Sequence, residues 1–333
     1  MSNKPPIEVP QGAIRLNTDS QRLEFFAQDR WYEFATNSPT LDGGDRGIFY
    51  GGSPNTNVID FVTIPTAGNA TDFGDALSAN RQRGVVSSTT RAVSHGRDGG
   101  SDVIEYVTFS STGNAQDFGD GTINRSGAPM AVSNGNRGIW AGGDVGNDSL
   151  TNVINYVTIA QTGNAVDFGD LNAIHSDGGR AQSPTRGVIG GGRGPNSSSF
   201  TNAMSFITIA TTGNSVDFGD LLLARNEIAS DSNATRGIFS GGNTPGATKD
   251  IEFITIATLG NSVNFGDQTN ESGSGRGSAN PTRFVISLGY VSPANSNIID
   301  YVQIATQGDS VDFGDLTRGS GQAAAASNGH GGL

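Results

Sequence analysis

The chain has 333 residues and a formal net charge of −12, so a nucleic-acid backbone, whose phosphates it would repel, is excluded as its partner. It contains no cysteine, which excludes disulfides and thiolate metal sites, and its 49 glycines favour short strands and tight turns over helices. No run of 18 apolar residues predicts a membrane-spanning helix, and Met1–Pro6 lacks the apolar core of a signal peptide. We therefore expect a soluble all-β protein without membrane insertion and without a standard secretory leader.

Residues 1–36 precede the rest of the pattern and predict a short β-hairpin segment. Three runs, at residues 12–19, 22–26 and 30–34, are typical of short strands separated by polar turns. The Gly-x-Ile-x-x-Asn-Thr start at Gly12 and the Trp31 near the end resemble a hairpin segment of phage tail and fibre proteins. The resemblance implies docking onto another virion protein, and the candidate docking residues are Phe25, Phe26, Trp31 and Tyr32.

The stretch Gly213–Asp220 recurs in near-copies, and the rest of the chain is spaced from it. Each copy centres on a phenylalanine followed by Gly and Asp, at intervals of 45 to 50 residues: Phe73, Phe118, Phe168, Phe218, Phe265 and Phe313. A second aromatic lies 12 residues before each phenylalanine, and an arginine lies 18 or 19 residues after each of the first five. A fixed spacing interrupted by one variable loop per copy predicts a repeat architecture.

Each unit divides into four short strands, most clearly in the fifth unit. Residues 226–230, 236–240, 251–256 and 261–265 predict these strands, with glycine at the turns, as is typical of a propeller blade. The main rival is an open solenoid, whose two ends would need polar caps. The chain ends favour a ring, because the unit that opens at Arg46 lacks a first strand and the tail after Phe313 has room for one. We predict that residues 37–333 form a six-bladed propeller closed by its C-terminal strand.

The order of these marks resembles that of kelch-type propellers over residues 46–330. A double glycine follows the second strand, as at Gly241-Gly242, and aromatics stand on the third and fourth strands. Phenylalanine replaces the family's fourth-strand tryptophan, and two units depart from the double glycine, at Gly96-Arg97 and Leu288-Gly289. The unit Thr-Gly-Asn-Ala-x-Asp-Phe-Gly-Asp also resembles repeats in structural proteins of marine and cyanobacterial phages, which implies a place in a virion.

The recurring Phe, Gly and Asp are interpreted as structural. We expect the phenylalanine to fill the space between adjacent blades and the glycine to permit their close approach. Each repeat aspartate, such as Asp220, is hypothesised to accept hydrogen bonds from backbone amides or from a repeat arginine such as Arg236. We predict no cofactor; calcium binding by paired acids such as Asp217 and Asp220 stays open, since the spaced acidic ladder of dedicated calcium loops is absent.

The loops between the second and third strands are the predicted place of binding. They vary in sequence, and alternation of strand direction puts them all on one face of a propeller. The candidate residues are Asp144, Asn147, Asp148, Arg193, Asn196, Phe200, Asn243, Lys249 and Tyr290. Unconstrained surface loops would vary in the same way, so that alternative stays open.

Catalysis has little support in the sequence, because His95, His175 and His330 occupy unrelated settings and none recurs beside a matched Ser or Asp.

We predict a non-enzymatic structural protein exposed on a phage virion. It would be tail-associated, as a fibre or tail-tip protein, and present its propeller to a host-surface glycan or protein. The alternatives are a head decoration protein, a polysaccharide-degrading propeller enzyme with unrepeated acids at its central channel, and a cellular kelch-type scaffold. The receptor, the position on the particle and the oligomeric state, a homo-oligomer included, stay open.

Overall fold

The computed structural model describes residues 9–17, 22–33, 45–147, 149–194 and 199–333. The chain forms two compact units, Met1–Thr40 and Leu41–Leu333. Strands are the only regular secondary structure in the described ranges, in agreement with the all-β prediction. A helix long and apolar enough to cross a membrane is not found there.

The first unit is a three-stranded antiparallel sheet, as the sequence predicts. Its strands are β1 (Ile14–Asn17), β2 (Arg22–Ala27) and β3 (Arg30–Glu33), with β2 in the middle. The register pairs Ile14 with Phe25 and Phe25 with Tyr32, so these three side chains share one face.

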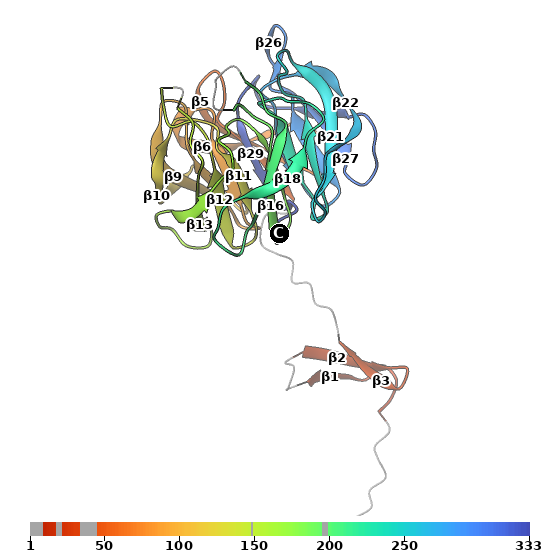
Figure 1. Cartoon of the computed structure of the whole chain (residues 1–333). Helices are drawn as coiled ribbons and strands as arrows, with labels where there is room; N and C mark the ends of the chain where they lie inside the picture. The colour runs from red at the N-terminus through yellow and green to blue at the C-terminus, as the bar shows by residue number, and fades with distance from the viewer. Residues whose placement is uncertain (1–8, 18–21, 34–44, 148, 195–198) are drawn as a thin grey trace, which may run out of the picture. The chain divides into compact units, whose positions relative to one another are not determined.

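The second unit contains six four-stranded antiparallel sheets in a propeller-like arrangement (Figure 1). We number the sheets 1 to 6 by their second strands, and the strands within each sheet from first to fourth. The first strands are β29 (Ala324–Ser327), β7 (Gly84–Ser87), β11 (Met130–Ser133), β15 (Gly179–Gln182), β19 (Ala229–Ser232) and β23 (Arg276–Ala279). The second strands are β4 (Arg46–Tyr50), β8 (Arg91–His95), β12 (Arg137–Ala141), β16 (Arg186–Gly190), β20 (Arg236–Ser240) and β24 (Arg283–Ser287). The third strands are β5 (Thr56–Thr63), β9 (Ser101–Thr108), β13 (Val153–Thr158), β17 (Ala203–Thr208), β21 (Thr248–Thr255) and β27 (Ile298–Gln303). The fourth strands are β6 (Thr71–Asn80), β10 (Gln116–Arg125), β14 (Val166–Asp170), β18 (Val216–Asp220), β22 (Val263–Ser272) and β28 (Val311–Asp315).

Sheet 1 joins the two ends of the second unit. Strand β29 pairs with β4, placing Ala324 opposite Tyr50 and Ser327 opposite Gly47. The first strand that the opening unit lacks is therefore supplied from the tail, as predicted. The six first strands contact one another in the order β29, β7, β11, β15, β19, β23 and back to β29. Residues from all six line one central cavity.

The structure differs from the sequence prediction in one additional sheet and in the bounds of several strands. The second unit carries a seventh sheet, a two-stranded hairpin of β25 (Tyr290–Val291) and β26 (Ala294–Asn295), which the sequence analysis did not predict. In sheet 5 the first strand is Ala229–Ser232 rather than residues 226–230, because Glu227 has a left-handed backbone with φ 54° that interrupts a strand. The second strand there has the predicted bounds, whereas the third begins three residues earlier than predicted, at Thr248, and the fourth ends seven residues later, at Ser272.

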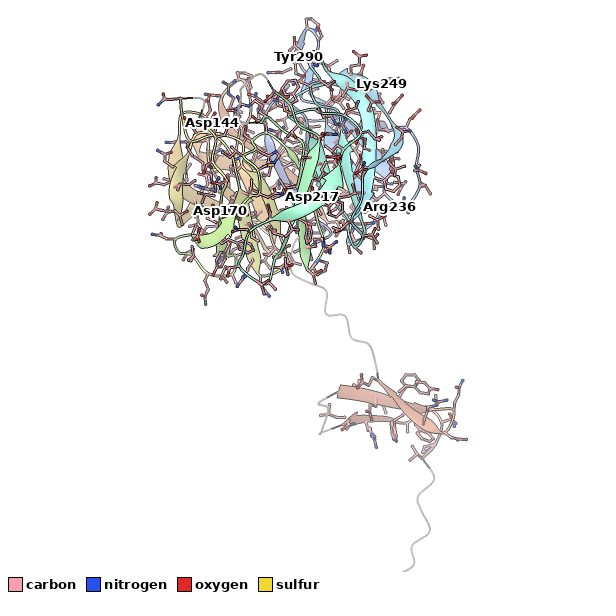
Figure 2. The ribbon with its side chains drawn as sticks, in the orientation of Figure 1. Asp144, Asp170, Asp217, Arg236, Lys249 and Tyr290 are labelled. Carbon is pink, nitrogen blue, oxygen red and sulfur yellow. The ribbon has the colours of Figure 1, made fainter. Side chains whose placement is uncertain are left out.

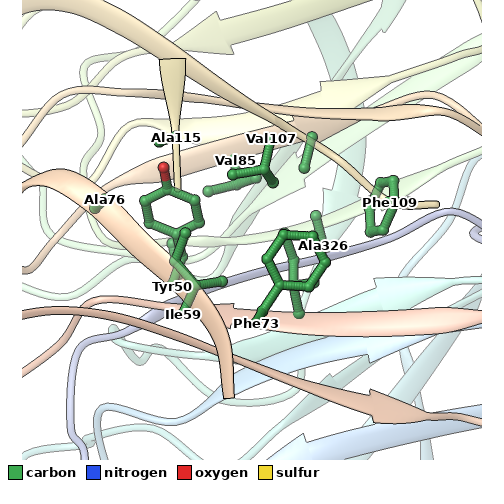
Figure 3. Packing of buried hydrophobic residues seen from close by; sticks show 12 residues of the cluster. Tyr50, Ile59, Phe73, Ala76, Val85, Val107, Phe109, Ala115 and Ala326 are labelled. Atoms are coloured by element: carbon green, nitrogen blue, oxygen red, sulfur yellow. The ribbon is translucent and has the colours of Figure 1, made fainter. Parts of the chain in front are cut away.

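The repeat phenylalanines pack between neighbouring sheets, as expected. Figure 3 shows one buried cluster in which Phe73 and Tyr50 of sheet 1 lie with Val107 of sheet 2. Phe109, the residue directly after strand β9, belongs to the same cluster. Each repeat phenylalanine also meets the third-strand aromatic of its own sheet edge-on, with ring centroids 5.9 Å apart for Phe61 and Phe73.

Backbone hydrogen bonds join the recurring motif of one sheet to the same motif of the next. Between sheets 3 and 4, the Gly213 N–H donates to the Phe168 carbonyl at 2.8 Å and the Ser215 N–H to the Asp170 carbonyl at 2.9 Å. The Asp170 N–H donates to the Asn214 side-chain oxygen at 3.0 Å. The equivalent side-chain contacts are Asn114 to Asp75, Asn164 to Asp120, Asn261 to Asp220, Asp309 to Asp267 and Asn69 to Asp315. We call this set of three bonds the clasp.

The glycine of the motif is required by the clasp. Gly219 has φ 138°, and a Cβ atom at this position would lie 2.5 Å from the carbonyl oxygen of Gly260 in the next sheet. Close approach and left-handed backbone therefore both select glycine, as the sequence analysis expected.

Of the two donors hypothesised for each repeat aspartate, the repeat arginine is wrong, whereas a backbone amide does donate to Asp220, from Ser262 to its carbonyl at 2.9 Å. Arg236 lies over the Phe253 ring, 4.8 Å from its centroid. Its Nη1 donates to the carbonyls of Ile304 and Ala305, both at 3.0 Å, which follow the third strand of the next sheet. Asp220 instead takes part in the clasp through its backbone. The arginine does join sheet to sheet, but through carbonyl oxygens and an aromatic face.

The last residues of the chain pack against the first strands at one end of the second unit (Figure 1). His330 is buried, with Nε2 3.1 Å from the Ser87 carbonyl oxygen and 3.2 Å from the Ser133 hydroxyl. Its Nδ1 accepts the Gly332 N–H at 3.0 Å. Because Nδ1 accepts a hydrogen bond, the ring is neutral with its proton on Nε2. Burial lowers the pKa of His330 from 6.5 to about 3.

We expect Gly219→Ala to lower the free energy of unfolding by about 2 kcal/mol or more, because the added methyl group collides with the next sheet and strains the backbone. The control is Gly246→Ala, where a Cβ meets nothing within 4 Å. Chemical denaturation measures both. Equal stability of the two variants would contradict the role of the clasp.

The neutral state of His330 predicts a pH dependence of stability. A pKa of about 3 in the fold, against 6.5 unfolded, means that its contribution is complete above pH 6.5 and declines as the pH falls toward 3. The stability difference between wild type and His330→Gln should therefore shrink by about 1.4 kcal/mol per pH unit below 6.5. Buried aspartates with raised pKa values act in the opposite direction in both proteins, so the difference is the quantity to measure. A difference that stays constant from pH 7 to 4.5 would show that His330 titrates normally.

Candidate functional site

One position per sheet recurs at the start of the loops that follow the second strands. It lies three residues beyond the last residue of each second strand, and its occupants are Ser53, Asp98, Asp144, Arg193, Asn243 and Tyr290. Five of them form an isolated β-bridge to the segment just before the first strand of their own sheet, as Asp144 does to Gly127. Figure 2 shows Asp144, Lys249 and Tyr290 toward one end of the second unit, and Asp170, Asp217 and Arg236 toward the other. We call the end with Asp144 the loop face.

Loops of sheets 2, 3 and 4 line an open groove of about 420 Å³ on the loop face. Its lining is Gln82, Asp98, Gly99, Ser126, Asp144, Gly146, Asn147 and Arg193. Three of these residues, Asp144, Asn147 and Arg193, are predicted binding residues. The structure therefore brings together candidates that are up to 49 residues apart in the chain. We call this site the polar groove.

Arg193 organises one wall of the polar groove. Its Nε donates to Asp177 Oδ2 at 3.0 Å, and its Nη2 lies 3.4 Å from Asp144 Oδ2. The other oxygen of Asp144 accepts the Ser126 hydroxyl at 2.8 Å and the Gly146 N–H at 2.7 Å. These four bonds hold the wall in place before any ligand arrives.

Asp177 lies behind this wall and is 4% exposed in its side chain. Burial raises the pKa of Asp177, the neighbouring Glu227 raises it further, and Arg193 opposes the rise. Its Oδ1 is buried without a hydrogen-bond partner among the described residues. The Arg193 contact is therefore the main compensation for a buried carboxylate.

Asp98 and Asn147 form the opposite, more exposed side of the groove. Asp98 Oδ2 accepts from Arg81 at 3.1 Å, and the Asp98 side chain is 38% exposed. Asn147 is exposed and has a left-handed backbone with φ 54°, which asparagine tolerates.

The other predicted binding residues lie outside the polar groove. Asn243 donates from Nδ2 to Glu227 at 2.8 Å, and Lys249 forms an exposed ion pair of 2.9 Å with Asp267. Tyr290, 40% exposed, belongs to the unpredicted hairpin, and Phe200 is half-buried. Asp148 and Asn196 lie outside the described residues.

The central cavity is small and its mouth is crossed by hydrogen bonds. Six left-handed residues precede the first strands: Gln82, Ala128, Asp177, Glu227, Ser274 and Gln322. Glu227 accepts from Gln322 at 2.6 Å, from Ser274 at 2.5 Å and from Asn243. The cavity of about 40 Å³ below them has room for a few water molecules.

Sequence reasoning missed Gln82, Asp98, Ser126 and Asp177. Asp98 was missed because sheet 2 lacks the double glycine that marks the loop in other sheets. The constant distance from the second strand would have found it. The other three precede first strands, where no repeated residue type marks the position.

The predicted docking residues of the first unit lie on two faces of its sheet. The rings of Phe25 and Tyr32 stack with centroids 5.5 Å apart, and Phe26 and Trp31 meet edge-on at 5.3 Å. Arg15 lies over Trp31. On the face of Phe25, the side chains of Ile14 and Leu16 are each 62% exposed.

No cluster of three or more His, Cys, Asp or Glu side chains suited to a metal ion occurs in the described part of the chain. Neither the models of known protein families nor the curated proteins contain a match to this sequence.

We expect Arg193→Ala to lower the free energy of unfolding by about 3 kcal/mol, because it leaves the buried carboxylate of Asp177 without its charged partner and with only the 3.4 Å contact from the Ser176 hydroxyl. The matched control is Arg81→Ala, whose partner Asp98 is exposed and whose loss should cost under about 1 kcal/mol. Chemical denaturation at pH 7 distinguishes them. Similar losses in the two variants would mean that Arg193 does not compensate a buried charge.

Proposed function

We propose that the second unit is a closed six-bladed β-propeller of the kelch type, with each four-stranded sheet as a blade. Three observations support closure. Strand β29 pairs with β4, the six first strands line one cavity, and the clasp between Asn69 and Asp315 joins sheet 1 to sheet 6. The double glycines and the third-strand aromatics support the kelch assignment.

We further propose that the protein is a non-enzymatic structural component of a phage virion, exposed on the particle. In this proposal it is tail-associated, as a fibre or tail-tip protein, and turns its loop face toward the host surface. The resemblance of the repeat to phage structural proteins supports the virion. The adhesive role rests on one observation. Equivalent positions on the loop face hold unlike side chains, such as Asp144 and Arg193, although the rest of the frame repeats.

The first unit is proposed to attach the propeller to another virion protein. A three-stranded sheet of this size cannot bury its own apolar face. Ile14, Leu16 and Leu23 are accordingly exposed on one face, beside Phe25 and Tyr32. A partner surface, or the same face of a second copy, would cover them.

One observation bears on the polysaccharide-degrading alternative. Unrepeated acids do gather at the centre: Asp177 and Glu227 at the mouth and Asp231 on β19. Asp231 accepts from Gln182 and from the Ala279 N–H, both at 3.0 Å. Each of these acids accepts at least one internal hydrogen bond, and the cavity beside them is too small for a sugar, which favours the non-enzymatic role. Head decoration is the alternative placement, and binding of the purified protein to host cells would argue against it.

We expect deletion of residues 1–40 to leave the unfolding temperature of the second unit unchanged and to abolish incorporation into particles. A full-length Leu16→Asp variant should also lose incorporation, since it places a charge on the apolar face. The control is Leu259→Asp, because Leu259 is 60% exposed, as much as Leu16, but lies on the second unit. Particle purification and immunodetection measure all three. Incorporation of the truncated protein would refute the docking role.

A further inference from the structure

None of the described residues that line the polar groove has an apolar side chain. Its eight lining residues are two glycines and six residues with charged, amide or hydroxyl side chains. Protein-binding surfaces depend on aromatic or aliphatic side chains at their centre, where water is excluded. This groove therefore suits a ligand that offers hydrogen-bonding groups rather than apolar area.

Several polar groups in the groove have no hydrogen-bond partner within the part of the chain that the structure describes. Asp98 uses only Oδ2 for Arg81, and its Oδ1 makes no hydrogen bond within the described residues. The side-chain amides of Gln82 and Asn147 likewise make none there. The opposite wall, in contrast, is tied together by Arg193 and Asp144. The groove thus combines a wall held in place by hydrogen bonds with donors and acceptors that are available to a ligand. A ligand with several adjacent hydroxyl groups could use both kinds of group.

The size and charge of the groove narrow the ligand further. Its volume of about 420 Å³ falls in the range of sites for small organic ligands. Its position across three successive sheets suits an elongated ligand. The carboxylates of Asp98 and Asp144 are matched by the guanidinium groups of Arg81 and Arg193, so there is no excess positive charge for an acidic sugar.

We propose that the polar groove binds a neutral oligosaccharide, with its hydroxyl groups engaging Asp98, Gln82 and Asn147. The inference rests on the proposed host-surface role and names the ligand class for it. Asp98 accepts from hydroxyls, the two amides both donate and accept, and the Arg193 wall limits the width of the chain that enters.

The test uses the full-length protein on immobilised neutral and uronic-acid oligosaccharides, and on host cells that are untreated, periodate-oxidised or protease-treated. The variants are Asp98→Asn and Asn147→Gly, which keep the side-chain shape or the left-handed backbone. The control is Asp267→Asn, which also removes the acid of an exposed ion pair but lies outside the groove. All variants should melt as wild type does.

We expect binding to at least one neutral fragment, weakened about tenfold or more by Asp98→Asn, as for loss of a charged hydrogen bond, and unchanged in the control. Periodate, which cleaves adjacent diols, should abolish binding to cells, and protease should not. Two results would overturn the proposal that the groove binds an oligosaccharide but keep the adhesive role. One is cell binding that protease removes, and the other is sugar binding that the groove variants leave unchanged. Selective binding of uronic-acid fragments would overturn the neutral assignment. Absence of binding to both sugars and untreated cells would overturn the adhesive role as well.

Discussion

The clasp between successive sheets is the interaction on which the second unit depends. It joins the backbone of Phe168 and Asp170 on one side to the backbone of Gly213 and Ser215 and the side chain of Asn214 on the other, so the glycine and the asparagine of the motif each have a physical reason. The glycine after the phenylalanine leaves room for the neighbouring carbonyl, and the asparagine supplies a side-chain acceptor. Asp309 replaces that asparagine in sheet 6 and accepts the same bond, which is consistent because only an oxygen is needed. Contacts of this kind are short-range and directional, so they fix the angle between sheets as well as their distance.

A frame built on repeated residues leaves the unrepeated ones for other tasks. The fourth-strand phenylalanines, the clasp and the repeat arginines recur around the second unit, whereas the position three residues after each second strand holds five residue types in six sheets. Asp144 and Arg193 occupy this position in adjacent sheets, and their opposite charges let them pair across the boundary. The wall of the polar groove between sheets 3 and 4 therefore depends on unlike residues at equivalent positions. An identical charged residue in both sheets would give repulsion between neighbours instead.

The sequence predicted the strands and the joining of the chain ends because both follow from spacing. A 12-residue interval between aromatics fixes the third and fourth strands, and a missing first strand at Arg46 requires one from the tail. It could not predict the partner of Arg236, because an arginine can bind a carboxylate, a carbonyl or a ring, and only the geometry selects among them. The left-handed residues before the first strands were missed for a similar reason. Glutamate and glutamine, as at Glu227 and Gln322, are not residue types that indicate this backbone.

The central cavity explains why binding should be sought on the loop face. Arg180 on β15 extends from sheet 4 to the Val85 carbonyl of sheet 2 at 2.9 Å, and also donates to the Ala325 carbonyl of sheet 1. Burial lowers the pKa of Arg180 and raises that of the neighbouring Asp231 to about 6, so both groups carry a desolvation cost that their hydrogen bonds offset. His330 closes the other end against Ser87 and Ser133. A centre tied together in this way acts as part of the frame. A ligand larger than a few water molecules must therefore bind at the loops. Among these, the polar groove has polar groups without a hydrogen-bond partner among the described residues.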